Sequence, residues 1–424
     1  MNLSGNSSAN NPRVASYDNN VYVVWTDNSS NGSGDIIYRK STDKGTTFDD
    51  AENLSNNPGN STDPLITAHR NNVYVIWTDD TTGNADIIFR KSSDYGNNFN
   101  RTINLSRNNG SSISPQLAAI DNNVYVVWTD DTRGNYDINL KASHNYGDTF
   151  SRTKPVSRNN GSSISPQLAA IDNHVYVVWT DDTRGNNNID LKTSHNYGDT
   201  FSRTKPVSRS NGSSISPQLA VSDNHVYVVW TEAISQGAWR FDGHSTNISN
   251  SDIDLKASHD YGNNFNRTIN LSRNNGSSIS PQLAAIDNNV YVVWTDNTTG
   301  KDDINFRKSS DYGKEFAGES NLSENLTGSF NPKLAGLDRE KIYVTWTAGT
   351  NDKSEVFFTA TGDSGEHFDN ALNLSRSAFS SDSAYIAAYQ NDAYLVWVEA
   401  ASSENEGEIL FKHVSEVFFP RNTK

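Results

Sequence analysis

A five-residue segment, Val-Tyr-Val-Val-Trp or a close variant, recurs eight times along the 424-residue chain. Successive tryptophans of this segment are 51 or 52 residues apart, except for one interval of 64. A fixed period of this length is typical of repeat architectures, in which each unit buries its apolar face against the next unit. The sequence therefore predicts eight similar units. The segments end at Trp25, Trp77, Trp128, Trp179, Trp230, Trp294, Trp346 and Trp397.

The second unit shows what one repeat contains. Residues 64–68, 73–77 and 86–91 are short segments rich in β-branched and aromatic side chains, and residues 98–105 form a fourth segment after a tight turn. Such segments favour strands, and no window holds a helical period. Four antiparallel strands in about 50 residues match one blade of a β-propeller. We therefore predict an all-β fold, an eight-bladed β-propeller with four antiparallel strands per blade.

We expect residues 1–424 to form a single domain. The eighth unit lacks a recognisable fourth strand, while Asn2-Leu3-Ser4 matches Asn53-Leu54-Ser55 at the end of a fourth strand elsewhere. Residues 1–11 are therefore predicted to close the last blade, with Val417-Phe418-Phe419 as the competing segment. The long interval places an insertion in the fifth blade at about residues 233–251.

Composition excludes several classes of protein. The absence of cysteine removes disulfide scaffolds, cysteine metal sites and thiol nucleophiles. The net charge of −15, without a basic block, argues against nucleic acid as a partner. No apolar run reaches the roughly 18–20 residues that a membrane span needs. The first residues, Met1-Asn2-Leu3-Ser4-Gly5, have neither a basic nor an apolar region, so no signal peptide is expected in this sequence.

A second motif, Ser-x-Asp-x-Gly-x-x-Phe, lies between the predicted third and fourth strands in seven units, once with Thr in place of Ser. A turn carboxylate or amide accepts backbone N–H groups, glycine permits positive φ, and the aromatic ring can fill the gap between sheets. Asn replaces Asp in two copies, which indicates that the position needs a hydrogen-bond acceptor rather than a charge. We assign a structural role to this position, which is Asp43, Asp94, Asn145, Asn196, Asp260, Asp311 and Asp363.

This turn motif resembles the Asp-box, or BNR repeat, of the sialidase superfamily of β-propellers. The resemblance covers nearly the whole chain, because the boxes keep the phase of the 51-residue period. It implies that the turns lie on the face away from the active site, so the box relates to the fold and not to catalysis. The superfamily includes exo-sialidases and other glycoside hydrolases, and also receptor and assembly-factor propellers that are not enzymes.

Sialidases also resemble one another in an Arg-Ile-Pro motif at the start of the first blade, a Tyr/Glu nucleophile pair and an acid/base Asp. This chain has Asn11-Pro12-Arg13-Val14, which places an arginine near that point without the motif, and no second arginine stands at a blade-specific position. We therefore predict no catalytic residues. The predicted function is a non-catalytic propeller, extracellular or at the cell surface, that binds glycans or proteins or acts as a surface scaffold. The alternative is a sialidase-like exo-glycoside hydrolase.

The first group of candidate binding residues follows the proline that opens each first strand. Polar and differing side chains at this position near the channel mouth would suit a small ligand or a glycan. The alternative is that they are solvated or link neighbouring blades. The candidates are Arg13, Gln116, Gln167, Gln218, Gln282 and Lys333, with Leu65 and, by alignment, Tyr385 at the same position.

The second group lies in the insertion of the fifth blade. Trp239 is the only tryptophan outside the repeated segment, and Arg240, Asp242 and His244 accompany it. An aromatic side chain among charged groups suits a sugar, and a unique loop is a natural place for a specific contact. The alternative is that the loop packs on its own blade.

Pairs of acids flank the loop between the second and third strands, as Asp79 with Asp86 and Asp130 with Asp137. Two carboxylates around a loop rich in Gly, Asn and Thr would suit Ca²⁺, although capping of loop N–H groups needs the same residues. No other cofactor is expected. Many Asn-x-Ser/Thr sequons make glycosylation possible in a secreted protein.

Overall fold

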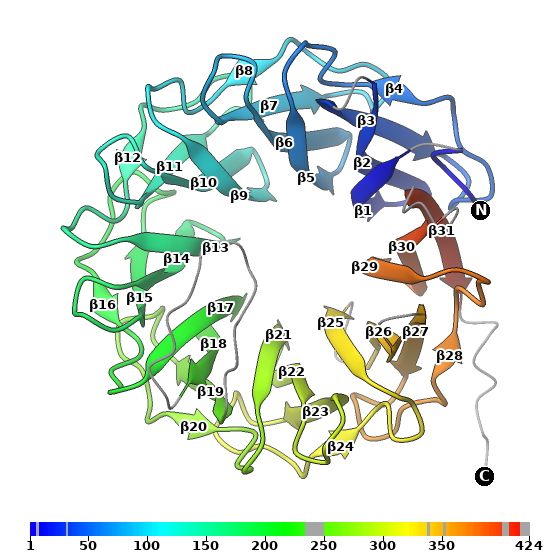
Figure 1. The fold of residues 1–424 in the computed structure, drawn as a ribbon. Helices are drawn as coiled ribbons and strands as arrows, with labels where there is room; N and C mark the ends of the chain where they lie inside the picture. Colours follow the sequence, from blue (N-terminus) through cyan, green and yellow to red (C-terminus); the bar gives the residue numbers. More distant parts are fainter. Residues whose placement is uncertain are drawn as a thin grey trace. The chain divides into compact units, whose positions relative to one another are not determined.

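The computed structural model describes residues 1–5, 8–30, 33–233, 250–336, 340–350, 353–400 and 407–415. Within these ranges the chain forms 31 β-strands and no helix. The strands make eight sheets, seven of four strands and one of three, and each sheet keeps the order of the sequence (Figure 1). These sheets are the blades of an eight-bladed β-propeller, so the predicted fold class is confirmed. The described part of the chain also has no helix long and apolar enough to cross a membrane.

The strands fall into two compact units, residues 1–121 with 333–424 and residues 122–332. The prediction that residues 1–424 form one domain stays a prediction. Strand β25 (Ser329–Gly336) contains the second boundary. The first unit contains β1 (Ala9–Tyr17), β2 (Asn20–Ser30), β3 (Ser33–Ser41), β4 (Glu52–Asn53), β5 (Ser61–His69), β6 (Asn72–Asp79), β7 (Asp86–Ser92), β8 (Ile103–Asn104), β9 (Ser112–Ile120), β26 (Ile342–Thr350), β27 (Lys353–Thr361), β28 (Leu372–Asn373), β29 (Ser381–Tyr389), β30 (Asp392–Ala400) and β31 (Gly407–Ser415).

The second unit is built in the same way from residues 122–332. It contains β10 (Asn123–Asp130), β11 (Asp137–Ser143), β12 (Lys154–Pro155), β13 (Ser163–Ile171), β14 (His174–Asp181), β15 (Asn188–Ser194), β16 (Lys205–Pro206), β17 (Ser213–Ser222), β18 (His225–Ala233), β19 (Ser251–Ser258), β20 (Ile269–Asn270), β21 (Ser278–Ile286), β22 (Asn289–Asp296), β23 (Asp303–Ser309) and β24 (Ser320–Asn321).

The second strand of each blade carries the core. All eight residues of β6 and of β22 are buried, because both faces of these strands meet other side chains. In the first unit, Val24 of β2 shares a cluster with Trp77 of β6. In the second unit, Val229 of β18 shares a cluster with Trp294 of β22. Burial of each such side chain contributes roughly 2–3 kcal/mol, which explains why this segment is the best preserved part of the repeat.

The fourth strands are shorter than predicted. The fourth segment of the second blade was expected over residues 98–105, but β8 spans only Ile103–Asn104 and pairs with two residues of β7. The residues before it, from Asn98 to Thr102, have exposed side chains except for the half-buried Phe99. Without apolar side chains on alternate positions, this stretch has little to bury against a neighbouring sheet.

The first strands β1, β5, β13, β17 and β21 contain a β-bulge beside a proline, and β29 contains the same bulge beside Ala384. The register between β1 and β2 shifts between Asn10 and Arg13, and the residue before Pro12, Asn11, is left-handed with a φ of 50°. Proline fits at a bulge, because it has no N–H to donate and the bulge leaves a residue without a ladder partner. The bulge also changes the direction of the side chain that follows the proline. The same left-handed position is Asp63, Ser114, Ser165, Ser216, Ser280, Asn331 and Ser383 in the other blades.

The box turns are held by their own side chains. In the second blade, Ser92 Oγ donates to Asp94 Oδ1 (2.6 Å), and Asp94 Oδ1 accepts from the backbone N–H of Asn98 (3.0 Å). In the third blade, Asn145 Oδ1 accepts from Ser143 Oγ (2.8 Å) and from the N–H of Thr149 (3.0 Å). The amide therefore makes the bonds that the carboxylate makes.

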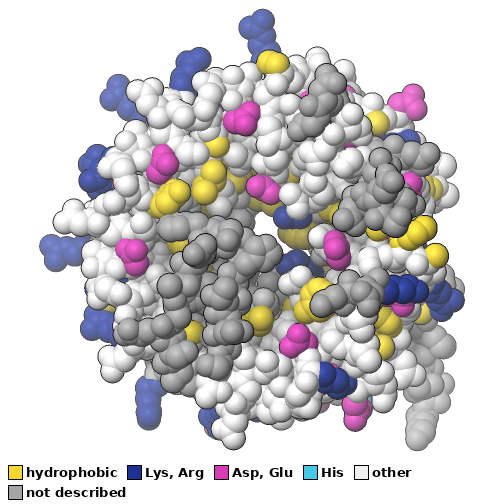
Figure 2. All heavy atoms as spheres, in the orientation of Figure 1, with side chains coloured by type: hydrophobic (Ala, Val, Ile, Leu, Met, Phe, Trp, Pro, Cys, Tyr) yellow, Lys and Arg dark blue, Asp and Glu magenta, His cyan; other side chains and the backbone are white. Residues whose placement is uncertain are grey.

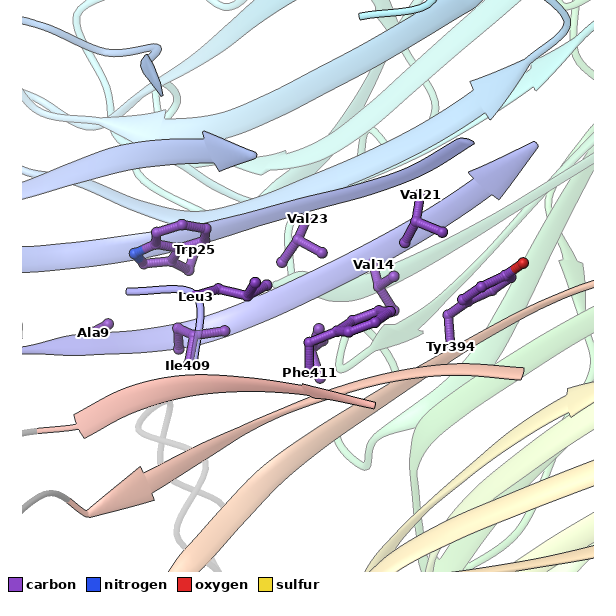
Figure 3. Close-up of a cluster of buried hydrophobic side chains, with 10 residues drawn as sticks. Leu3, Ala9, Val14, Val21, Val23, Trp25, Tyr394, Ile409 and Phe411 are labelled. Carbon is purple, nitrogen blue, oxygen red and sulfur yellow. The ribbon is translucent and has the colours of Figure 1, made fainter. Parts of the chain in front are cut away.

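The N-terminal residues lie beside β31, the last strand of the three-stranded sheet. The N–H of Leu3 donates to the carbonyl of Ile409 (2.8 Å), and the N–H of Phe411 donates to the carbonyl of Met1 (2.8 Å). The Leu3 side chain is buried in a cluster with Trp25 and Ile409 (Figure 3). The competing segment, residues 417–419, lies outside the described residues.

Candidate functional site

The residues that follow the bulges occupy the same position on successive first strands. In the first unit this position is held by Lys333 on β25, Tyr385 on β29, Arg13 on β1, Leu65 on β5 and Gln116 on β9, all of them partly exposed. The predicted residues Gln167, Gln218 and Gln282 hold it in the second unit. Gln282 Nε2 donates to the carbonyl of Pro281 (2.9 Å), so this amide is bound to its own strand.

The structure brings Arg13 and Tyr385 together. The guanidinium carbon of Arg13 lies 4.8 Å from the centre of the Tyr385 ring, which is a cation–π contact. Arg13 Nη1 donates to the carbonyl of Pro12 (2.9 Å), and its buried Nε has no hydrogen-bond partner in the described part of the chain. The Arg13 guanidinium is therefore held in place by the Tyr385 ring and by the carbonyl of Pro12, and not by a carboxylate.

Lys333 adds a second positive charge at the same position of another blade. Burial and the positive charge of Arg13 lower the pKa of the Lys333 amine from 10.5 to about 8. No acidic group acts on this pKa, and no ion pair joins Lys333 or Arg13 to a carboxylate among the residues that the structure describes. Two cations without a counter-charge, in a protein of net charge −15, favour an anionic ligand.

The left-handed residues two positions before the site residues are mostly neutral. Of the left-handed residues that precede the site position in the first unit, Asp63 alone is acidic. Asp63 Oδ1 accepts a hydrogen bond from Asn11 Nδ2 (3.1 Å) of the neighbouring first strand. The site therefore offers a guanidinium, an amine and a phenol, and it lacks a pair of facing carboxylates at these positions.

The predicted calcium ligands are engaged in hydrogen bonds. Asp79 Oδ2 accepts from Asn57 Nδ2 (2.7 Å) and Ser61 Oγ (2.7 Å), and its Oδ1 accepts from the N–H of Thr81 (3.1 Å). Asp86 accepts from two hydroxyls and an amide of its own blade. In the third blade, Asp130 Oδ1 accepts from the N–H of Thr132 (3.1 Å), and Asp137 pairs with Arg133 (3.0 Å). The described residues contain no group of three metal-ligating side chains, and calcium binding stays a prediction.

The insertion residues Trp239, Arg240, Asp242 and His244 lie outside the described residues, so their predicted role is not tested. On the surface that Figure 2 shows, acidic and basic side chains are scattered singly and do not gather into one patch. The positive charge of the candidate site therefore comes from Arg13 and Lys333 themselves and not from a larger basic surface.

One carboxyl group was missed by sequence reasoning. Asp254 of β19 pairs in register with Trp230, where the first two blades have the apolar residues Ile37 and Ile88. Burial, followed by the charges of Glu232 and Asp252, raises the pKa of Asp254 to about 7. The same position is polar in the third, fourth and sixth blades, as Asn139, Asp190 and Asn305, so no break in the repeat marked this carboxyl group in the sequence.

No family model and no curated protein sequence matches this chain. Among solved structures, it is similar to a PL25 ulvan lyase bound to -[GlcA(1-4)Rha3S]-, with 12% identity and a TM-score of 0.54 over 98% of this chain and 96% of that chain. It is also similar to the polysaccharide lyase Uly1, with 9% identity and a TM-score of 0.50 over 83% and 89% of the two chains. A Hadza microbial sialidase is 14% identical, with a TM-score of 0.44 over 69% of this chain and 65% of that chain.

These comparisons correct the predicted function. The two polysaccharide lyases that share the fold process glycans, so the prediction of a non-catalytic binding propeller, and with it the prediction of no enzyme activity, is wrong in favour of its enzymatic alternative. The prediction rested on the absence of the Arg-Ile-Pro motif and of blade-specific arginines. The absence of these arginines argues only against the sialidase reaction, because other reactions on glycans need other residues. At these identities the likeness establishes the fold, and the activity is a matter for proposal.

Proposed function

We propose that this protein is an enzyme that cleaves acidic polysaccharides by β-elimination at the site formed by Arg13, Tyr385 and Lys333. The observation that carries the proposal is the cation pair without a carboxylate partner. A uronic acid in a polysaccharide supplies the missing negative charge. We place the protein outside the cell, where such polysaccharides occur.

The reaction breaks a C–H and a C–O bond of the sugar and forms a C=C bond, while the proton is taken up by a base and the leaving oxygen receives a proton from an acid. Removal of the proton on the carbon beside the carboxylate, with loss of the glycosidic oxygen from the next carbon, leaves a C=C bond in the new chain end. Arg13 binds the carboxylate and stabilises the charge that moves onto it as the proton leaves. The Lys333 amine takes this proton, since a lowered pKa leaves part of it neutral near pH 7. The Tyr385 hydroxyl gives a proton to the departing oxygen, and the two side chains then exchange the proton back.

Hydrolysis, the reaction of the sialidase-like alternative, is less well supported by these residues. A glycosidase uses two carboxyl groups, about 5–5.5 Å apart in retaining and 6.5–9.5 Å apart in inverting enzymes. Among the left-handed bulge residues of the first unit, Asp63 is the single acid in the described part of the chain. Proton abstraction beside a carboxylate needs no such pair. The resemblance of the box turns to the sialidase superfamily supports a common fold and leaves the reaction open.

The test is to incubate the purified protein with ulvan and with polygalacturonate and to follow the ultraviolet absorbance of the unsaturated product. We expect absorbance to rise with one of these substrates, and a fluorogenic sialoside to stay uncleaved. Arg13→Gln is expected to abolish the rise. Arg101→Gln removes the same charge from an exposed position elsewhere in the first unit and is the matched control.

Three results would overturn the proposal. The first is an absence of unsaturated product from both polysaccharides. The second is cleavage of the sialoside in their place, which would establish the hydrolase. The third is equal activity of the Arg13→Gln and Arg101→Gln variants.

A further inference from the structure

We propose that the exposed tyrosines on the box turns of the second unit form a separate binding surface for the sugar rings of an acidic polysaccharide chain. These residues, which we call the turn tyrosines, are Tyr146, Tyr197, Tyr261 and Tyr312. They stand directly before the glycine of the box and do not belong to the candidate active site. The inference goes beyond the proposed reaction and does not depend on it, because binding is measured apart from turnover.

The turn tyrosines are unusual in being exposed. Seven large hydrophobic side chains are exposed in the described part of the chain, and five of them are tyrosines at this one turn position, the fifth being Tyr95 of the first unit. Tyr261 is 40% exposed and Tyr312 is 37% exposed. An exposed aromatic that recurs on one kind of turn marks a contact surface.

The backbone holds each turn tyrosine in a strained conformation. The φ angle is 60° at Tyr261 and 64° at Tyr312, a left-handed region that bulky residues seldom adopt. Each of these N–H groups donates to a hairpin turn of the same blade, to the carbonyl of Asn224 (2.8 Å) and of Asn288 (2.9 Å). The backbone from which each tyrosine side chain projects is therefore fixed relative to the rest of its blade. A strained backbone conformation that surrounding hydrogen bonds maintain is a feature of functional sites.

The turn itself does not require tyrosine. Serine occupies the same position in the seventh blade, as Ser364 with a φ of 64°, and lysine occupies it in the first blade, as Lys44 with a φ of 59°. Both blades form the turn bonds of the box. The aromatic ring therefore adds something other than the turn.

Histidine rings support two of the tyrosines from behind. The Tyr261 ring stacks on His174, with centroids 4.5 Å apart and planes 14° apart, and His174 stacks in turn on the buried Tyr176. Tyr312 stacks on His225 in the same way, at 4.4 Å and 16°. One face of each tyrosine is thus covered and its ring is oriented. A rigid ring with an open face loses little entropy when it binds a ligand.

The surroundings favour a polysaccharide over a protein. A protein interface needs a contiguous apolar core, whereas the turn tyrosines are separated, one to a blade. A polysaccharide presents its own repeated apolar ring faces, so that several weak contacts act together. Lys205 lies beside the turn of Tyr261, where its Nζ donates to neutral oxygens, among them the carbonyl of Gly262 (2.8 Å). Burial lowers the pKa of Lys205, and the Asp260 carboxylate of this turn raises it without forming an ion pair with Lys205 in the described part of the chain. This cation favours an acidic chain.

The experiment is affinity electrophoresis in gels that contain ulvan or polygalacturonate. It is performed in the Arg13→Gln background, so that the candidate active site does not contribute. Tyr261→Ser together with Tyr312→Ser places at both turns the residue that the seventh blade already uses. Phe379→Ser, which removes an exposed aromatic from a connection in the first unit, is the matched control.

We expect the polysaccharide to retard the background protein and the Phe379→Ser variant alike. The double tyrosine variant is expected to bind roughly tenfold more weakly or worse. Equal retardation of the double variant and the control overturns the inference, as does an absence of retardation in the background protein. Failure of the proposed reaction appears separately, as missing unsaturated product from the unmodified protein.

Discussion

Replacing Asp254 by asparagine is expected to stabilise the protein at neutral and mildly alkaline pH. In the folded protein the pKa of this carboxyl group is raised from 3.8 to about 7. Between these values the unfolded chain has released the proton that the folded protein still holds. The free energy of unfolding therefore falls as the pH rises through this range. Asparagine has no titrating carboxyl group, so the free energy of unfolding of the Asp254→Asn variant does not fall in this way.

The magnitude follows from the size of the shift. About three pKa units correspond to ~4 kcal/mol at 1.36 kcal/mol per unit. Asp254 keeps some contact with solvent, which screens the interaction, so we discount the value to about 2 kcal/mol at pH 8 and about zero near pH 4. The fold accepts the substitution, because Asn139 and Asn305 pair with the strand tryptophan in the third and sixth blades.

The assay is urea unfolding of both proteins, followed by tryptophan fluorescence at about pH 4 and about pH 8. Asp296→Asn is the control, because hydrogen bonds such as that from Ser278 Oγ (2.6 Å) lower the pKa of Asp296, and its replacement should not stabilise. The reasoning is refuted if Asp254→Asn lowers stability at the higher pH, or if its gain is the same at both pH values.

Two further predictions concern the active site and the box. The rate of elimination should rise with pH through about 8 and then level off, as Lys333 loses its proton, and Lys333→Met should remove this dependence together with most of the activity. Initial rates across this range test it, and an unchanged profile in the variant contradicts it. Gly45→Ala should destabilise by at least ~2 kcal/mol more than Gly134→Ala. Both glycines have positive φ, but a Cβ at Gly45 would overlap the Phe411 ring while one at Gly134 meets nothing within 4 Å. Thermal unfolding of both variants measures the difference, and equal melting temperatures would contradict it.

The fold could be predicted because its determinants repeat. Each strand tryptophan marks a buried second strand, and the spacing of these tryptophans alone counts the blades. The short fourth strands were less predictable, since two paired residues such as Ile103 and Asn104 leave almost no pattern.

The site was predictable only in part. Alignment of the repeats with one another placed Arg13, Lys333 and Tyr385 at one position of the repeat. It could not predict which of them are in contact, because they belong to three different blades. The distance between Arg13 and Tyr385 depends on how two sheets pack, which no local pattern reports. The turn tyrosines occupy an unspecified position of the box, and their exposure became visible only once the turn was built. Asp254 could not be found from the repeat alone, because Asn139, Asp190 and Asn305 hold the same position in other blades.

The pairing of Leu3 with Ile409 has a consequence for how the protein is made. Residues about 400 positions apart in the chain lie in one sheet, and the N–H of Ile409 also donates to Ser4 Oγ (2.8 Å). During translation the segment around Leu3 emerges long before β31, so its apolar side chain stays uncovered until β31 has left the ribosome. A contact of such long range is slow to form. Early blades can assemble as they appear, but the contact of the eighth blade with Leu3 forms only after β31 has been made, and this is the stage at which we expect the chain to depend on chaperones.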